Sequence, residues 1–153
     1  MTLSISSPAF SEGEKIPPEY TCEGSGISPQ LNWVGIPEGT KSLALIVDDP
    51  DAPGGVFTHW VVFNIPPDSS GLSKAFPPTP VLPDGTLQGD SDFGRTGYGG
   101  PCPPRGKPHR YRFNLYALDK KLDLSAGSSK NQVLNATRGH ILAQGQLTGT
   151  YQR

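Results

Sequence analysis

Short apolar runs, separated by clusters of glycine and proline, predict a chain of β-strands. Five segments have strand length and carry mostly apolar or alternating residues: 31–34, 42–49, 58–65, 110–118 and 143–151. Turn residues bound them, as in the Asp-Pro-Asp-Ala-Pro-Gly-Gly run at 49–55. Many short strands with such turns between them are typical of an antiparallel β-sandwich. The pattern predicts a mainly β protein that forms a single domain over residues 1–153.

Only one segment carries the signals of a sizeable helix. Residues 128–138 begin with serines that can cap a helix, present a narrow apolar face around Val133 and Leu134, and end before Gly139. The segment is short, so we expect one peripheral helix. Residues 66–108 are rich in proline and are expected to be mostly irregular. Irregular segments of this length are uncommon inside a domain and usually serve a function.

Three of the predicted strands have an apolar face that ends in an ionisable residue. Alternate residues of a strand share a face, so Asp49 continues the odd-numbered face of 43–47, whereas His59 and His109 begin theirs. We expect the first two strands to be antiparallel neighbours and the third to run parallel to the second. The three side chains would then meet at one end of the core, which predicts a polar pocket there.

Each of these residues also has an ordinary structural explanation. Asp49 and Asp51 flank a proline in a turn, where aspartate commonly hydrogen-bonds its own backbone. A histidine such as His59 on an apolar face is more often a satisfied core residue than a ligand contact. However, burying ionisable groups costs several kcal/mol unless they are paired, and here several point inward together. Their coincidence favours a binding site.

Charge and length exclude several classes of function. Lys and Arg number 13 and Asp and Glu 14, which gives a formal net charge of −1 with no long block of like charge. We therefore expect no nucleic-acid partner. The longest apolar run, 43–47, is far shorter than the roughly 20 residues that span a bilayer, and the first residues lack the features of a signal peptide. No transmembrane segment and a cytoplasmic location are predicted.

Cysteine usage and turn chemistry give two further expectations. Cys22 and Cys102 lie far apart and form no C-x-x-C pair, so we expect two reduced thiols rather than a zinc or redox motif. Two prolines close together in the 49–55 turn imply a sharp chain reversal. A cis peptide bond before Pro50 or Pro53 is predicted on that ground.

An enzyme that uses the same Asp and His residues is the alternative to a binding protein. Two aspartates and two histidines could serve acid–base chemistry or hold a metal, although their spacing fits no common metal motif. The Gly100–Lys107 segment resembles a phosphate-binding loop, but its spacing is one residue too long and Pro108 follows the lysine. No nucleophile lies in these motifs, so a hydrolase or metal-dependent enzyme ranks second. No catalytic residue, cofactor or metal is predicted.

The same motifs resemble those of the phosphatidylethanolamine-binding protein family, which includes the Raf kinase inhibitor protein. The matching runs are Asp-Pro-Asp-Ala-Pro at 49–53, Thr-His-Trp-Val-Val-Phe-Asn at 58–64, Gly-Gly-Pro-Cys-Pro-Pro at 99–104 and Lys-Pro-His-Arg-Tyr at 107–111. Several motifs in the right order make the resemblance specific, and it covers the chain from about residue 5. The bacterial and archaeal branch, which is Raf kinase inhibitor-like, is the most similar.

The resemblance implies a β-sandwich with a small anion pocket that holds a phosphate or a phospholipid head group. Carried over by motif, the ligand-binding residues are Asp49, Asp51, His59, Gly100, Pro101, Pro103, His109 and Tyr111. Two carboxylates beside an anion would repel it, so we expect each aspartate to orient a histidine. An interaction protein that inhibits kinases or proteases through its surface is a third hypothesis. A homodimer or a monomer is expected rather than a large assembly, and the homodimer is slightly favoured.

Overall fold

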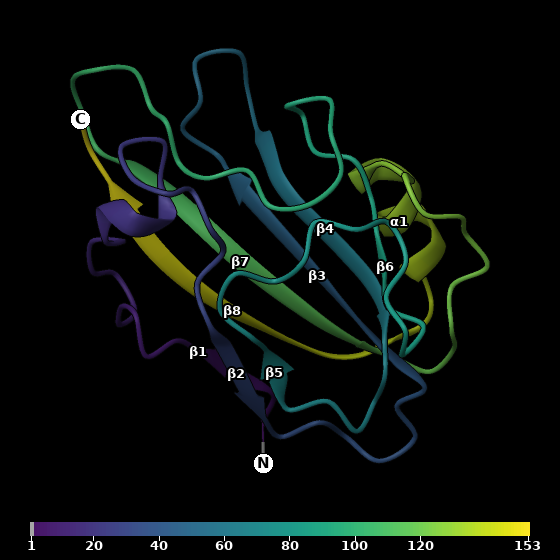
Figure 1. Ribbon diagram of the computed structural model, residues 1–153. Helices are drawn as coiled ribbons and strands as arrows, with labels where there is room; N and C mark the ends of the chain where they lie inside the picture. Colours follow the sequence, from purple (N-terminus) through teal and green to yellow (C-terminus); the bar gives the residue numbers. More distant parts are fainter. Residues whose placement is uncertain (1) are drawn as a thin grey trace.

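The computed structural model describes residues 2–153 and contains two antiparallel sheets, as predicted (Figure 1). The small sheet has the order β1-β2-β5 and the large sheet the order β6-β4-β3-β7-β8. In chain order the elements are β1 (Ser4–Ser6), the 3-10 helix η1 (Pro18–Tyr20), β2 (Leu31–Val34), β3 (Ser42–Asp49), β4 (Phe57–Ile65), β5 (Gly71–Leu72), β6 (Leu87–Gln88), β7 (His109–Leu118), α1 (Lys130–Thr137) and β8 (Ile141–Tyr151).

The five strands expected from the sequence are all present, with boundaries within two residues. The strands that the sequence pattern missed are β1, β5 and β6, which have only two or three residues each. A periodic pattern cannot be recognised over so short a stretch. Two of them, β5 and β6, lie in the segment expected to be irregular, and most of that segment is indeed without regular structure.

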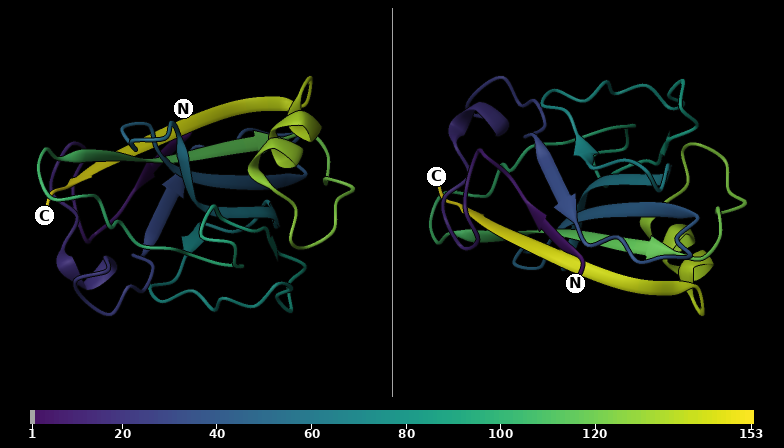
Figure 2. Two further views of the ribbon diagram at one scale, coloured as in Figure 1. Left: turned by 90° about the horizontal axis from the view of Figure 1, so that it is seen from above. Right: turned by 90° about the horizontal axis from the view of Figure 1, so that it is seen from below.

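The large sheet is covered on both faces, which explains why every residue of β3 is buried. One face packs against the small sheet and forms the main core, which includes Leu31, Trp33, Leu45, Trp60, Phe113 and Leu147. The other face packs against α1 and the segment before it, through Ala44, Ile46, Val61, Phe63, Leu122 and Val133. Figure 2 shows the large sheet between these two layers.

The helix α1 begins and ends where its sequence signals indicate. The Ser129 hydroxyl accepts the backbone N–H of Gln132 at 3.2 Å, and the Gln132 side chain accepts the backbone N–H of Ser129 at 2.8 Å. This reciprocal capping box satisfies two backbone donors that a helix start leaves free. Val133 and Thr137 are buried against the sheet, and Gly139 follows with a φ of 78°, where glycine ends a helix without strain.

The prediction of a cis proline bond is wrong. Among residues 2–153 no peptide bond is cis. The turn between β3 and β4 reverses over seven residues, with Gly55 at a φ of 111° and its N–H bonded to the carbonyl of Ala52. A loop of this length with a flexible glycine makes the reversal with ordinary trans bonds.

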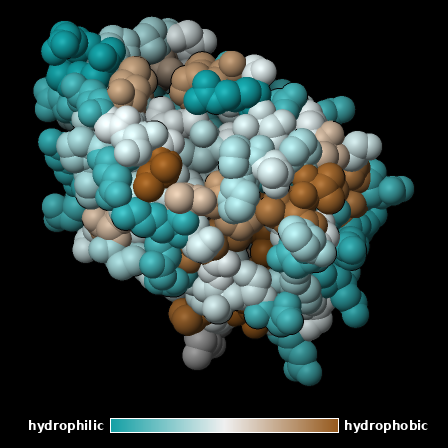
Figure 3. All heavy atoms as spheres, viewed as in Figure 1, coloured by the Kyte–Doolittle hydropathy of each residue, from teal (hydrophilic) through white to brown (hydrophobic). Residues whose placement is uncertain are grey.

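In the described part of the chain, no helix is long and apolar enough to cross a membrane. On the face drawn in Figure 3, apolar residues form small patches separated by polar ones. Large exposed apolar side chains, such as Val34 and Val81, occur in different segments of the chain. Scattered apolar residues of this kind are normal on a monomer surface and do not mark a binding face. The concave regions are therefore better candidates for function.

Candidate ligand-binding site

Three strands of the large sheet bring the predicted polar residues to one end. β3 is antiparallel to both β4 and β7, so its last residue lies at the end where those two strands begin. Asp49 pairs in register with Phe57 at the start of β4, and β7 begins at His109. This end is at the upper left of the sheet in Figure 1. The predicted convergence of Asp49, His59 and His109 is confirmed.

A β-bulge at His59 interrupts the pairing of β3 with β4. Val47 is opposite Trp60, but the next residue of β3, Asp48, is opposite Thr58. His59 is thus the additional residue on its strand. A bulge of this kind places two residues of one strand against one of its partner and redirects a side chain.

The bulge decides which face of the sheet His59 occupies. Strict alternation would place it with Val61 and Phe63, and both of these pack on the α1 side. Instead, the His59 ring packs edge to face on Tyr111, which belongs to the main core, with ring centroids 5.2 Å apart. The sequence therefore predicted the correct site for His59 from an alternation that the strand does not follow. β4 contains no glycine that would mark the bulge in the sequence.

A cavity of about 230 Å³ lies at this end of the sheet. Its wall is formed by Asp49, Ala52, Pro53, Phe57, His59, Phe93, Cys102, Pro103, Pro104, His109 and Tyr111. Five of the eight predicted residues are in this set, whereas Asp51, Gly100 and Pro101 are not. The two aromatic residues Phe57 and Phe93 were not predicted. Phe57 lies on the same strand as His59, so the strand pattern could have identified it. Phe93 lies in an irregular loop that has no such pattern.

Asp49 and His109 form a hydrogen-bonded pair in the cavity wall. The His109 Nδ1 atom lies 2.7 Å from Asp49 Oδ2, and both side chains are largely buried. An ionised carboxylate can only accept, so the proton of this bond is on Nδ1 and Nε2 is the ring nitrogen left for a ligand. The other Asp49 oxygen accepts the backbone N–H of Asp51 at 2.8 Å. Asp49 thus orients a histidine, as expected.

His59 is held by backbone groups rather than by an aspartate. Its Nδ1 lies 2.7 Å from the carbonyl oxygen of Gly99, and the Gly99 N–H donates to the His59 carbonyl at 2.9 Å. Burial lowers the pKa of His59, although the Gly99 carbonyl and the Asp49 carboxylate act in the opposite direction. The ring therefore favours the neutral form with Nδ1 protonated. A Cβ at position 99 would lie 2.2 Å from the ring of Phe93, so a larger residue there would displace that ring.

Asp51 points away from the cavity and pairs with Arg110. Its carboxylate accepts the Arg110 backbone N–H at 2.9 Å and two guanidinium N–H groups at 3.0 and 2.9 Å. The hydrogen bonds from Arg110 lower the pKa of Asp51 to about 2. The expectation that Asp51 orients a histidine is wrong, because Arg110 already takes both of its oxygens. Its charge is nevertheless neutralised, which reduces the repulsion of an anion.

Tyr111, a residue of the cavity wall, carries an unsatisfied buried hydroxyl. Tyr111 is 1% exposed, and its oxygen has no hydrogen-bond partner among residues 2–153. Burial, together with the nearby Asp49 carboxylate, raises the pKa of this phenol, so it remains a neutral donor at physiological pH. Leaving a buried hydroxyl unpaired costs about 1–3 kcal/mol, so such atoms call for an explanation.

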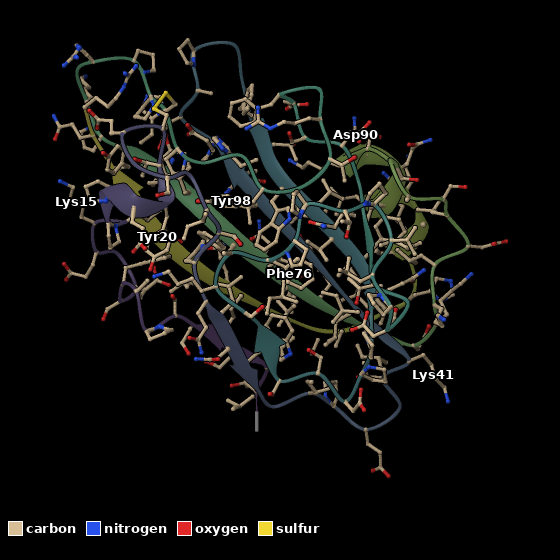
Figure 4. All side chains as sticks on the ribbon, in the orientation of Figure 1. Lys15, Tyr20, Lys41, Phe76, Asp90 and Tyr98 are labelled. Carbon is tan, nitrogen blue, oxygen red and sulfur yellow. A yellow bond between two sulfur atoms is a disulfide. The ribbon has the colours of Figure 1, made fainter. Side chains whose placement is uncertain are left out.

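Gly100 and Pro101 lie outside the cavity and connect its wall to a neighbouring loop. A Cβ at position 100 would lie 2.6 Å from the carbonyl oxygen of Tyr20, and the Pro101 carbonyl accepts the N–H of Cys22 at 3.1 Å. The Tyr98 hydroxyl donates to the same Tyr20 carbonyl at 2.8 Å, and the two tyrosines lie beside one another in Figure 4. These residues therefore attach the wall segment to the loop around η1 and do not themselves face the cavity.

Cys22 and Cys102 form a disulfide, which corrects the expectation of two reduced thiols. Their Cα atoms are 5.4 Å apart, and the bond is the yellow one in Figure 4. Distance along the chain gave no hint of it, because only the docking of the two loops brings the cysteines together. A cytoplasmic location stays a prediction, but the expectation of reduced thiols no longer goes with it.

The donor groups at this end do not form a metal-binding cluster. Within residues 2–153, no three or more His, Cys, Asp or Glu side chains are grouped so that they could hold one metal ion. Asp49 and His109 are instead bonded to each other, and His59 is bonded to Gly99. The arrangement of hydrogen-bonding groups does not favour the metal-dependent alternative.

Comparisons with known proteins agree with the geometry. The sequence profile described as phosphatidylethanolamine-binding protein matches residues 6–152. A UPF0098 protein of Methanothermobacter thermautotrophicus is 55% identical over 151 residues, which is 99% of each chain. The structure of a putative phosphatidylethanolamine-binding protein homologue, CT736 from Chlamydia trachomatis, is 41% identical over 99% of this chain and 98% of its own, with a TM-score of 0.90. E. coli YbcL is 37% identical with a TM-score of 0.91, covering 100% and 99% of the two chains.

Proposed function

This chain belongs to the phosphatidylethanolamine-binding protein family, and we propose that its cavity binds a compact anion with a phosphate-like head. The ligand would be free phosphate or the phosphoryl group of a small ester, such as a phospholipid head group. A volume of about 230 Å³ favours a compact ligand, since pockets for drug-sized molecules typically span ~300–1,000 Å³.

The Tyr111 hydroxyl is the observation that carries this proposal. It is a buried donor without a protein partner in the described chain, and Tyr111 is one of the residues that line the cavity. A ligand oxygen in the cavity would accept its proton and remove the cost of the unpaired group. Hydrogen bonds to an ionised acceptor are about twice as strong as those between neutral groups, which favours an anion over a neutral ligand.

His59 and His109 provide two further polar atoms for the ligand. Both use Nδ1 within the protein, so Nε2 of each is the nitrogen that would meet the ligand. The carboxylates of Asp49 and Asp51 are engaged by His109 and Arg110, which lowers their repulsion of an anion. With both carboxylates neutralised in this way, the ligand needs no cationic group of its own.

Hydrolysis is not part of the proposal. The cavity wall contains no serine, threonine or free thiol that His59 or His109 could activate, because its one cysteine is in the disulfide. Nucleophilic catalysis needs such a group within hydrogen-bond reach of a base. No contact among residues 2–153 favours a kinase or protease as partner, so the proposal is confined to a small ligand.

Tyr111→Phe tests the proposal because it should change stability and affinity in opposite directions. Removal of the unpaired hydroxyl should raise the free energy of unfolding by about 1 kcal/mol, while phosphate binding should weaken by about tenfold. Urea unfolding and titration calorimetry with inorganic phosphate measure the two effects.

Tyr98→Phe is the matched control for this substitution. Its hydroxyl already donates to Tyr20 and is not in the cavity wall, so the variant should lose about 1 kcal/mol of stability and keep its affinity for phosphate. Unchanged phosphate affinity in Tyr111→Phe would place the ligand elsewhere and overturn the proposal.

Anion affinity should rise as the pH falls from about 8 to about 6, because a bound anion raises the pKa of a neighbouring histidine. Burial lowers the pKa of His59 in the free protein, so its contribution should continue to grow below its ordinary value near 6.5. Sulfate is the better probe here, because it does not titrate in this range whereas phosphate does. Calorimetry with sulfate at several pH values should give this slope, and His59→Gln should flatten it. A metal site would give the opposite slope, because its ligands must lose protons to coordinate.

A further inference from the structure

The segment 100–104, which contributes Cys102, Pro103 and Pro104 to the cavity wall, has little backbone hydrogen bonding of its own. Its sequence is Gly-Pro-Cys-Pro-Pro, and the three prolines lack an N–H group. The segment is also outside the regular secondary structure. A stretch of chain without ladder or helix bonds keeps its place only through contacts with other segments.

Two neighbouring segments hold this wall. On one side, the disulfide joins Cys102 to Cys22, and the Cys22 N–H donates to the Pro101 carbonyl. On the other side, the Arg153 side chain donates to the Pro103 carbonyl at 2.6 Å. The disulfide is the only covalent link between the wall and the rest of the fold apart from the chain itself, in the described residues. Breaking it would leave Pro101 and Cys102 attached to the η1 loop by far weaker contacts.

The disulfide is open to solvent and lies beside the ligand cavity at the same time. Cys22 and Cys102 are both exposed, and Cys102 also forms part of the cavity wall. A bond whose purpose is only to stabilise a small core is usual in domains too small to bury enough apolar surface. This chain has an extensive core on both faces of its large sheet, so we expect it to remain folded without the bond. Because the disulfide is accessible to a dissolved thiol and borders the cavity, its role is better sought at the cavity.

We propose that Cys22 and Cys102 form a reversible dithiol–disulfide pair that controls how tightly the cavity holds its anion. This inference rests on the proposed function, since it names the regulation of the same site. In the oxidised protein the wall is fixed and the cavity is preorganised. In the reduced protein the wall is free to move away from Tyr111 and His109, and binding must first order it again.

The reaction that switches the pair is thiol–disulfide exchange with an external dithiol. The thiolate of the dithiol attacks one sulfur, which forms a mixed disulfide and releases the other cysteine as a thiolate. The second thiol of the reagent then attacks the mixed disulfide and frees the first cysteine. The reagent ends as a disulfide, and the protein gains two electrons and two protons as two Cys thiols. Oxidation by a disulfide reagent reverses each step.

Phosphate binding in the two redox states tests the proposal. We expect the dissociation constant for inorganic phosphate to be about tenfold higher in protein reduced with dithiothreitol than in oxidised protein, because an ordering cost is added to binding. The Cys22→Ser, Cys102→Ser double variant should bind as weakly as the reduced protein and should not respond to dithiothreitol. Equal affinities in the oxidised and reduced wild type would overturn the proposal.

Amide hydrogen exchange of the ligand-free protein separates this inference from the proposed function. Reduction should speed exchange at Cys22, Cys102 and the amides of residues 105–107, while β3 and β7 keep their protection. Unchanged exchange in these amides, or a disulfide that dithiothreitol reduces only in denaturant, would overturn the inference. If oxidised protein fails to bind phosphate, the proposed function is refuted, and the exchange comparison still decides whether the wall responds to reduction.

Discussion

His109→Ala is expected to lower the free energy of unfolding by about 3 kcal/mol near neutral pH, because it leaves a buried carboxylate without its partner. The side chains of Asp49 and His109 are only 5% and 11% exposed, so water cannot replace the lost hydrogen bond fully. From the sequence, a residue at the start of a strand would be expected to be dispensable for stability. The pairing with Asp49 reverses that expectation.

The loss in His109→Ala should shrink as the pH is lowered. In the folded variant the Asp49 carboxylate is buried without its histidine partner, so its negative charge opposes folding. Acid removes that charge and with it most of the penalty. Chemical denaturation at several pH values measures the trend.

Asp49→Asn combined with His109→Ala is the control for this interpretation. The double variant carries no buried charge, so it should be more stable near neutral pH than His109→Ala alone, and its stability should depend less on pH in the acid range. A single variant as stable as the wild type would show that the pair does not contribute to folding.

Loss of the disulfide should lower the free energy of unfolding by about as much as His109→Ala does. Cys22 and Cys102 are separated by 80 positions, and the chain-entropy relation gives about 4.5 kcal/mol for a closed loop of that size, whereas typical measured losses are about 2–4 kcal/mol. The Cys22→Ser, Cys102→Ser protein should therefore melt about 10 °C below the oxidised wild type. Small domains have a total stability of about 5–15 kcal/mol, so we expect the variant to remain folded.

The single variants distinguish the bond from the packing of its sulfur atoms. Either Cys22→Ser or Cys102→Ser breaks the same covalent link, so each should lose nearly as much stability as the double variant. Reduced wild type should melt close to all three in calorimetry. Losses that simply add between the two single variants would mean that the disulfide is not the source of the effect.

Most of the framework follows from local patterns along the chain. β7 alternates between buried and less buried residues, and β3 is a continuous apolar run that ends in turn residues. The serine cap and Gly139 mark α1. All these signals act between neighbours along the chain. The family motifs also identified the end of the sheet where the site lies. Five of the eight predicted site residues line the cavity, since each comes from a strand end or motif that faces it.

How those residues are used depends on contacts that form only in the folded chain. The bulge that turns His59 into the cavity depends on the register of β3 with β4, which alternation cannot reveal. Arg110 removes Asp51 from the site, and the docking of the η1 loop places Cys22 beside Cys102. Each of these outcomes depends on contacts between segments that are distant in the chain. Pairing, burial and disulfide formation follow from distance in space, which a one-dimensional pattern does not contain.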